Sequence, residues 1–283
     1  MIECTDNARV PAVSASHGKL RRVQRIVDPA DRRSTILPLD AVLVVGCVPG
    51  AEDLASLLRF PQDGAPDAVM LRYGEARRLA HELPADVGLI VRLSGASEDG
   101  PDPTFERLTN SVEAAAALGA DAVCATLKLG SRREDEMLSA IGRIAEECDR
   151  TGIVFLCEAF ALDAGGNLQT AGERPARSAR IAQELGADLV KIANPGEPDE
   201  MRTISAWCAV PIVVAGGEQT SPAALIRSIT AALEGGAAGV AIGRNVISHP
   251  DPALMQRLLR AVVHDRVSEE DAISMLESAV VPL

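Results

Sequence analysis

The sequence is poor in aromatic residues: among its 283 residues are one tryptophan, one tyrosine and four phenylalanines, 2% in all. So few rings argue against a β-sandwich, and against a nucleic-acid module that stacks bases on aromatic side chains. Hydrophobic residues still make up 47% of the chain, so small and branched aliphatic side chains must fill a sizeable core. The aromatic residues are Phe60, Phe105, Phe155, Phe160, Trp207 and Tyr73.

The chain also lacks an excess of positive charge. It has 40 acidic and 28 basic residues, a net charge of −12, which opposes non-specific binding to nucleic acid or to anionic membranes. The first thirty residues carry no hydrophobic signal core, and no apolar run reaches membrane-spanning length. We therefore expect a soluble, cytoplasmic protein with no nucleic-acid or membrane partner. A local cationic pocket for an anionic substrate remains compatible with this charge.

Cysteine pairs and metal-like clusters are absent from the sequence. No two cysteines form a C-x-x-C pair, and most lie in apolar segments, which predicts reduced, buried thiols. The histidines fall in expected helices and loops, and no His/Asp/Glu spacing suggests a metal site, so neither a metal nor a cofactor is expected. The six cysteines are Cys4, Cys47, Cys124, Cys148, Cys157 and Cys208.

What the chain does have is a recurring phrase, close to Gly-Ala-Asp-Ala-Val, at residues 64–69, 119–123, 186–190 and 236–240. Each copy follows a helical pattern and precedes a short apolar run. Glycine suits the end of a helix, and the apolar run suits a strand that is buried on both faces.

Eight such apolar runs alternate with amphipathic segments. Alternation of this kind predicts right-handed βαβ units and a parallel sheet, and eight units at this length predict a closed (β/α)₈ barrel of TIM type in one domain. A doubly wound sheet is the alternative, but no G-x-G-x-x-G follows the first strand. The expected strands are 35–39, 68–72, 88–93, 122–128, 153–159, 189–192, 211–215 and 239–242, and the clearest helices are 104–118, 133–150, 175–185 and 222–233.

Two terminal features complete the predicted organisation. Residues 1–34 precede the barrel and are expected to form an arm or a capping segment, made basic by Lys19, Arg21, Arg22 and Arg25. Residues 35–283 are expected to hold the barrel and a last helix over 268–279, with Ser268 as its N-cap.

Reactive side chains in such a barrel lie at the carboxyl ends of the strands and in the loops that follow. This rule selects a set of candidates without any knowledge of relatives. They are Asp40, Arg72, Tyr73, Arg92, Ser94, Gly95, Lys128, Glu158, Phe160, Lys191, Gly216, Gly217, Gly243 and Arg244.

Lys191 interrupts the apolar run 189–193. A lysine in a strand buried on both faces is costly unless it is paired or neutral. Burial would lower its pKa, as a Schiff-base nucleophile requires. Two interpretations stay open at this point: a nucleophile, or a lysine that reaches the barrel mouth or pairs with a carboxylate.

The last two expected strands end in glycines. Gly216 and Gly217 follow one strand, and Gly243 and Arg244 follow the other. Barrels of this type commonly bind phosphate with the loops after strands 7 and 8, where glycine allows close approach to the backbone. The pattern favours a phosphate site over two ordinary tight turns.

Side-chain alternation places Glu158 and Phe160 on one face of a strand, and Thr126 and Lys128 on one face of the strand before it. If Lys128 and Glu158 both point into the barrel, they are expected to form an ion pair. Such a pair is either structural, or it tunes Lys191 and moves protons.

These residues, taken with segments 18–22, 38–40, 93–95 and 211–245, resemble a known family. It comprises the archaeal-type class I fructose-bisphosphate aldolases and the 2-amino-3,7-dideoxyheptulosonate synthases, with the autoinducer-2 thiolases as more distant relatives. The resemblance implies that Lys191 forms the Schiff base and that Asp40 transfers protons. It also implies that Gly217, Gly243 and Arg244 bind phosphate, and that the protein forms a homo-oligomer.

The chain departs from the family pattern at three places. The family's Asp-His-Gly after strand 1 is here Asp40 followed by Ala41, its tyrosine on strand 5 is here Phe160, and its histidine and asparagine on strand 4 are here Thr126 and Lys128. Phenylalanine cannot donate a proton, so Glu158, on the same face, is the expected substitute.

The sequence thus predicts a lyase: a class I aldolase or aldol-type synthase that acts on a phosphorylated ketose or a related carbonyl compound. The predicted catalytic residues are Lys191, Asp40, Glu158 and Lys128, with substrate held by Ser94, Gly95, Gly216, Gly217, Gly243 and Arg244. The alternatives are a thiolase-like acyl transferase or isomerase on a phosphorylated substrate, and an inactive barrel that only binds a phosphorylated ligand.

Overall fold

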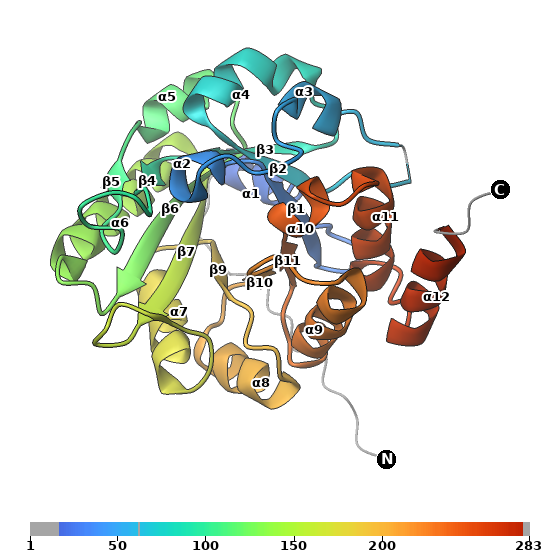
Figure 1. The fold of residues 1–283 in the computed structure, drawn as a ribbon. Coiled ribbons are helices and arrows are strands. Elements are labelled where there is room, and N and C mark those ends of the chain that lie inside the picture. The colour runs from blue at the N-terminus through green and yellow to red at the C-terminus, as the bar shows by residue number, and fades with distance from the viewer. Residues whose placement is uncertain (1–16, 62, 280–283) are drawn as a thin grey trace.

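In a computed structural model of the chain, which describes residues 17–61 and 63–279, eight parallel strands form a closed barrel surrounded by helices (Figure 1). The strands pair in the order β1-β2-β3-β6-β7-β9-β10-β11, and β11 returns to pair with β1. The barrel strands are β1 (Ser34–Pro38), β2 (Ala68–Arg72), β3 (Gly88–Arg92), β6 (Ala122–Leu129), β7 (Val154–Leu162), β9 (Leu189–Ala193), β10 (Ile212–Ala215) and β11 (Gly239–Ala241).

All eight predicted strands are present, and closure of the sheet excludes the doubly wound alternative. The barrel follows from the sequence because each strand is apolar on both faces, so that one face fills the barrel and the other packs on helices. The helices are α1 (His17–Val23), α2 (Val42–Val45), α3 (Leu54–Leu57), α4 (Tyr73–Leu79), η1 (Ala80–Glu82), α5 (Val112–Ala117), α6 (Glu134–Thr151), α7 (Glu173–Glu184), α8 (Pro198–Trp207), α9 (Pro222–Glu234), α10 (Arg244–Ile247), α11 (Pro252–Val263) and α12 (Glu269–Ala279).

The prediction of a helix over 104–118 is largely wrong, because α5 begins only at Val112. Part of the preceding stretch forms β5 (Arg107–Leu108), which pairs antiparallel with β4 (Ser94–Gly95) above the end of β3. The Asn110 side chain also donates a hydrogen bond to the carbonyl of Arg92 over 2.9 Å. Helical periodicity could not reveal these tertiary contacts. The strand β8 (Leu168–Gln169) similarly extends the sheet by pairing with the end of β7.

The amino-terminal end of the barrel is closed from below by α1 and the residues after it. Ile26 and Val27 pack with the lower interior side chains of the barrel, such as Ile36 and Met70. Lys19 of α1 is buried, with its Nζ 2.8 Å from Oδ2 of Asp188. Residues 1–16 of the predicted arm, including Cys4, lie outside the described residues.

Four of the cysteines, Cys124, Cys148, Cys157 and Cys208, are buried and free, as predicted, but Cys47 is exposed. It follows the short helix α2 on a surface loop, where the apolar neighbours that suggested burial do not enclose it. Among the described residues, no helix is both long and apolar enough to cross a lipid bilayer.

Where α11 ends, the side chain of His264 contacts carboxylates at the amino-terminal end of the barrel, which we call the foot of the barrel. Its Nδ1 lies 2.8 Å from Asp31 and its Nε2 lies 2.9 Å from Oδ2 of Asp67, which also accepts hydrogen bonds from Thr35. Arg260 faces the same Asp67 at 3.6 Å. Burial lowers the pKa of His264, but the two carboxylates outweigh it and the pKa is raised. The sequence pattern had suggested only a surface or helix residue.

We expect this histidine to make stability depend on pH. Because its pKa is raised on folding, its contribution is complete below about pH 6.5, the unfolded value, and is lost as the pH rises through the folded value. His264→Gln should lower Tm near pH 6 by about 2–6 °C, for a loss of about 1–2 kcal/mol. Melting curves from pH 6 to 9 check this: the difference between the two proteins should shrink toward pH 9, and a constant difference would contradict the prediction.

Candidate active site

The inward-facing side chains at the upper ends of four strands form one polar layer. Arg92 ends β3, Thr126 lies on β6, Glu158 on β7 and Lys191 on β9. The strand register sets Thr126 beside Glu158 and Glu158 beside Lys191. Apolar residues such as Ile90 and Leu156 fill the barrel two residues below, so this layer is the floor of the site.

Above this floor lies a pocket of about 430 Å³ at the carboxyl ends of the strands. Asp40, Lys128, Glu158 and Lys191 all line it, as do Gly216, Gly217, Gly243 and Arg244. The structure therefore brings the four predicted catalytic residues and the four predicted phosphate-binding residues into one cavity. Ser94 and Gly95 behave differently: they belong to β4, and neither is among the residues that line the pocket.

Lys191 forms a close ion pair with Glu158. Its Nζ lies 2.6 Å from Oε1 of Glu158, and the side chain is only about 10% exposed. The sequence had suggested that burial lowers the pKa of Lys191. Burial does act in that direction, but the carboxylates of Glu158 and Asp40 outweigh it, so the pKa is raised. At rest Lys191 is therefore an ammonium ion that must lose a proton before it can act as a nucleophile.

Glu158 is held by cations on both of its oxygens. While Oε1 faces Lys191, Oε2 accepts hydrogen bonds from Arg92 at 2.6 Å and from Thr126 at 2.8 Å. Burial raises the pKa of a carboxyl group, but here the positive charges of Arg92 and Lys191 outweigh burial and lower the pKa of Glu158. The group is thus a carboxylate throughout the neutral range.

The predicted pair between Lys128 and Glu158 is wrong. Lys128 lies two residues farther along β6 than Thr126, so its neighbour in the strand register is Phe160 and not Glu158. Its Nζ donates to the carbonyl of Pro103 over 2.7 Å and lies 3.5 Å from Oε1 of Glu106. The segment between β4 and β5 supplies both partners, and parity counting on two adjacent strands could not place that segment.

Sequence reasoning missed Glu106 and left Arg92 and Thr126 out of the predicted catalytic set. Glu106 is 7% exposed and accepts a hydrogen bond from Ser94 Oγ over 2.6 Å. Arg92 satisfied the strand-end rule, and its parity with Ile90 points it into the barrel. An arginine in a strand that is buried on both faces was therefore a usable signal, whereas nothing in the local pattern marked Glu106.

The loops after β10 and β11 are tied together at the opposite side of the pocket. Arg244 donates to the carbonyl of Gly217 over 2.9 Å, and the Asn245 amide donates to the carbonyl of Gly216 over 3.2 Å. Gly217 has a φ of +68°, and a Cβ on Gly243 would lie 2.2 Å from the carbonyl oxygen of Pro38. Space therefore requires glycine at position 243, and the backbone conformation favours it at position 217. The short helix α10 starts at Arg244, the arrangement that barrels use to bind phosphate.

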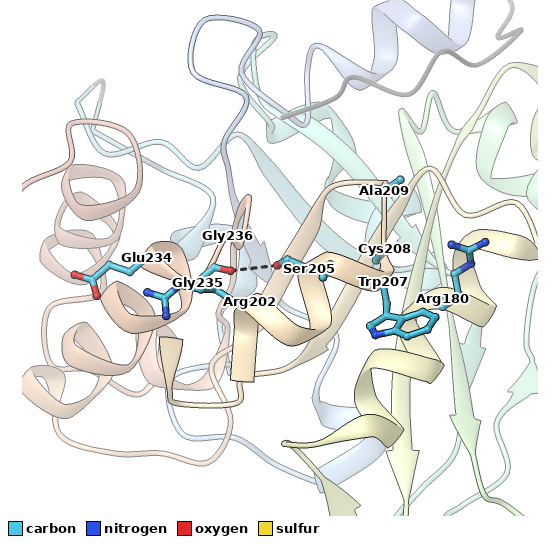
Figure 2. Close-up of a pocket in the computed structure, with 10 residues that line it drawn as sticks. Arg180, Arg202, Ser205, Trp207, Cys208, Ala209, Glu234, Gly235 and Gly236 are labelled. Carbon is cyan, nitrogen blue, oxygen red and sulfur yellow. Dashed lines mark hydrogen bonds between the residues drawn. The ribbon is translucent and has the colours of Figure 1, made fainter. Parts of the chain in front are cut away.

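A larger hollow, of about 680 Å³, lies elsewhere on the surface, where α8 and α9 end (Figure 2). It is lined by Trp207, which is 60% exposed, and by Arg180 and Arg202. Both arginines already pair with carboxylates of their own helices, Glu184 and Asp199. The buried Cys208 also lines this hollow, but burial raises the pKa of its thiol to about 11, which keeps it protonated and a poor nucleophile. The smaller pocket at the strand ends is the better candidate for catalysis, because the paired charges of Lys191 and Glu158 open into it.

One group of side chains among the described residues is close enough to share a metal ion: Asp28, Asp31 and His264, at the foot of the barrel. Both ring nitrogens of His264 already contact carboxylates, which accounts for the cluster as a structural contact. It lies at the end of the barrel opposite to the pocket.

Comparison with known proteins agrees with this geometry. The family model described as DeoC/LacD family aldolase matches residues 26–249, most of the chain. The chain belongs to this family. Its members are aldolase-type enzymes, so the chain is an aldolase-type lyase built on a TIM barrel, and the resemblance seen in the sequence is confirmed.

Two relatives within the family are similar over nearly their whole length. The 2-amino-3,7-dideoxy-D-threo-hept-6-ulosonate synthase of Halobacterium salinarum is 34% identical over 257 residues, 91% of this chain and 96% of the relative. The 2-amino-4,5-dihydroxy-6-oxo-7-(phosphonooxy)heptanoate synthase of Streptomyces griseus is also 34% identical over 257 residues, 90% of this chain and 93% of the relative.

A solved structure shows the same barrel with a reacted lysine. It is an archaeal fructose-1,6-bisphosphate aldolase with its catalytic lysine covalently bound to the carbinolamine intermediate of the substrate. Its TM-score to this chain is 0.79 at 29% identity, covering 87% of this chain and 99% of the other.

Proposed function

We propose that the protein is a class I aldol synthase or aldolase in which Lys191 forms a Schiff base with a phosphorylated ketone. The observation that carries this proposal is the position of Lys191 Nζ, 2.6 Å from a carboxylate at the floor of a pocket rimmed by the two glycine loops. A phosphate held by Arg244 and these loops would place the ketone carbon over the lysine.

The reaction can be followed through named atoms. Lys191 passes its proton to Oε1 of Glu158, and the free amine adds to the ketone carbon, whose π electrons move to oxygen. The proton on Glu158 passes to that oxygen, and the nitrogen, now positively charged, gives up one of its two protons to Glu158. This second proton also passes to the oxygen, which leaves as water while the nitrogen lone pair forms the iminium double bond. The iminium draws electrons from the neighbouring carbon, which then loses a proton and attacks an aldehyde. Hydrolysis releases the product and restores Lys191.

Asp40 is the best-placed group to move protons at the substrate carbon and oxygen. It lines the pocket, and its Oδ2 lies 3.4 Å from Arg92, much farther than the 2.6 Å that separates Arg92 from Glu158. Phe160 occupies the place of the family's tyrosine and has no proton to give. Glu158 therefore exchanges protons with the nitrogen of Lys191, and Asp40 exchanges protons with the substrate.

For the second substrate we propose an aldehyde that carries an anionic group. The Streptomyces griseus relative is named for a product with a 6-oxo group, a 7-phosphonooxy group and a heptanoate carboxylate, and its 4-hydroxyl is β to the ketone, as an aldol addition leaves it. Lys128 lines the pocket with an ammonium ion that Glu106 and Pro103 hold in place, and it can contact a carboxylate.

Borohydride trapping tests the proposed function directly. The protein is incubated with dihydroxyacetone phosphate, reduced with borohydride, digested and analysed by mass spectrometry. The expected result is a reduced adduct on Lys191 and on no other lysine. Absence of an adduct with this ketone and with fructose 1,6-bisphosphate would reject the Schiff-base mechanism.

The homo-oligomer implied by the family stays a prediction, to be checked by light scattering in solution.

Arg244→Ala tests the phosphate site. Loss of a charge-assisted hydrogen bond to phosphate, about 1.5–3 kcal/mol, should raise KM for the phosphorylated ketone by about 10–100-fold. Because this contact is made equally before and during the chemical step, kcat should change little. Steady-state kinetics measure both. Arg227→Ala is the matched control, since Arg227 pairs with Glu269 outside the pocket, and an unchanged KM in Arg244→Ala would remove Arg244 from the phosphate site.

A further inference from the structure

Arg92 is the hub of the buried charges beneath the pocket. It is 3% exposed, and each of its guanidinium nitrogens has a polar neighbour. Nη2 lies 2.6 Å from Oε2 of Glu158 and 3.3 Å from Oε2 of Glu106, and it also contacts the Thr126 hydroxyl. Nη1 lies 3.4 Å from Asp40, so three carboxylates from three different segments meet one cation.

The geometry around Glu158 is asymmetric. Its Oε2 is occupied by Arg92 and Thr126, while its Oε1 is left to Lys191. A planar guanidinium fixes a carboxylate more closely than a lysine can, because its donors have a rigid arrangement. The orientation of Oε1 toward Lys191 therefore depends on what holds Oε2.

We propose that Arg92 is a positioning residue that clamps Oε2 of Glu158, so that Oε1 faces Lys191 Nζ, and whose charge helps Lys191 to lose its proton. The inference rests on the proposed function in one respect only: the neutral amine of Lys191 matters for catalysis if Lys191 forms the Schiff base. Arg92 touches no reacting atom itself. Arg92 and Lys191 contact the two oxygens of the same carboxylate, and a nearby like charge favours the neutral form of the group that can titrate, which here is Lys191.

The experiment measures the titration of Lys191 without any substrate. Trace acetylation with acetic anhydride labels only neutral amines, and mass spectrometry of the Lys191 peptide across pH gives the midpoint of labelling. In Arg92→Gln, loss of the neighbouring cation should move this midpoint upward by about one pH unit or more. Arg92→Lys keeps the charge, and its midpoint should stay near that of the unmodified protein.

Arg72→Gln is the matched control. Arg72 pairs in register with Arg92 on the neighbouring strand, and its hydrogen bonds go to the main-chain carbonyls of Asp40 and Ser94. It should leave the labelling midpoint near its original value, even if the variant is less stable. A purely structural role for Arg92 would likewise lower Tm without moving the midpoint, so an unshifted midpoint in Arg92→Gln overturns the proposal.

A second variant covers the case in which Arg92→Gln does not fold. Arg92→Gln combined with Glu106→Gln removes one positive and one negative charge from the cluster. Its midpoint should still move upward, but by less than in Arg92→Gln, because loss of the Glu106 carboxylate opposes part of the shift. Because labelling needs no ketone, a missing borohydride adduct in the unmodified protein would reject the proposed function alone. An adduct in the unmodified protein together with an unshifted Arg92→Gln midpoint would reject only the role of Arg92.

Discussion

Replacing Lys191 by methionine should abolish turnover, with a loss of about 10⁵-fold or more, the scale seen when a covalent nucleophile is removed. Methionine has nearly the length of the lysine side chain but has no amine, so no carbinolamine can form. Steady-state assays of carbon–carbon bond cleavage or formation measure the loss, and borohydride trapping should give no adduct on this variant.

The fold should survive this change. Removing one partner of a buried ion pair costs about 3–5 kcal/mol, but Glu158 keeps Arg92 and Thr126 on its other oxygen, so its charge stays paired and the loss of stability should lie at or below the lower end of that range. Lys128→Met is the informative comparison, because Lys128 lies at the pocket wall and not at its floor. It should still give the Lys191 adduct while it raises KM for the aldehyde. Appreciable turnover by Lys191→Met would remove Lys191 from the mechanism.

Glu158→Gln should impair both catalysis and stability. It removes the carboxylate that pairs with Lys191 and Arg92, and loss of a general acid–base group costs about 10²–10⁴-fold in rate. The pKa of Lys191 should fall in this variant, since burial and Arg92 remain while Glu158 no longer opposes them. Schiff-base trapping should therefore persist while turnover drops, a split that separate assays of adduct and product can measure.

The cost in stability has a defined dependence on pH. Removing one partner of a buried ion pair costs about 3–5 kcal/mol. Because the pKa of Glu158 is lowered on folding, its contribution is complete above the unfolded value, about 4.5, and is lost as the pH falls toward the folded value. Urea denaturation at pH 7 and at pH 4 should show a smaller difference between the two proteins at the lower pH.

Thr126→Val provides the control for Glu158→Gln. It deletes the hydrogen bond that the Thr126 hydroxyl donates to Oε2 of the Glu158 carboxylate and keeps the shape of the side chain, so it should cost about 1.5–3 kcal/mol, below the range expected for Glu158→Gln. If Glu158→Gln were no less stable and no slower than Thr126→Val, Glu158 would have no special part in holding or deprotonating Lys191.

Much of the scaffold could be predicted because it depends on local pattern. The eight apolar runs and the helices between them determined a barrel, and the strand-end rule selected Lys191, Glu158 and Asp40 before any contact was known. The cap of α12 is equally local: Ser268 accepts a hydrogen bond from the Asp271 amide over 3.1 Å, as its position three residues earlier predicted.

The predictions that were wrong concerned contacts between segments far apart in the chain. The stretch before α5 was expected to be helical, but it folds over the end of β3 and brings Glu106 to Arg92 and Lys128. That contact decided which carboxylate Lys128 pairs with. Strand parity gives the face on which a side chain lies, but not which of several charges at the barrel mouth it will reach.

The scarcity of aromatic residues shows the same contrast between features that depend on the sequence alone and features that depend on the tertiary structure. The sequence alone determined a TIM barrel filled by aliphatic side chains, with Phe160 where related aldolases have a tyrosine and with carboxylates and lysines left to move protons. Only the tertiary structure decided the state of those groups. Burial by itself would lower the pKa of Lys191, but Glu158 and Asp40 converge on it from other strands and raise the pKa, because electrostatic energy depends on distance in space and not on distance along the chain.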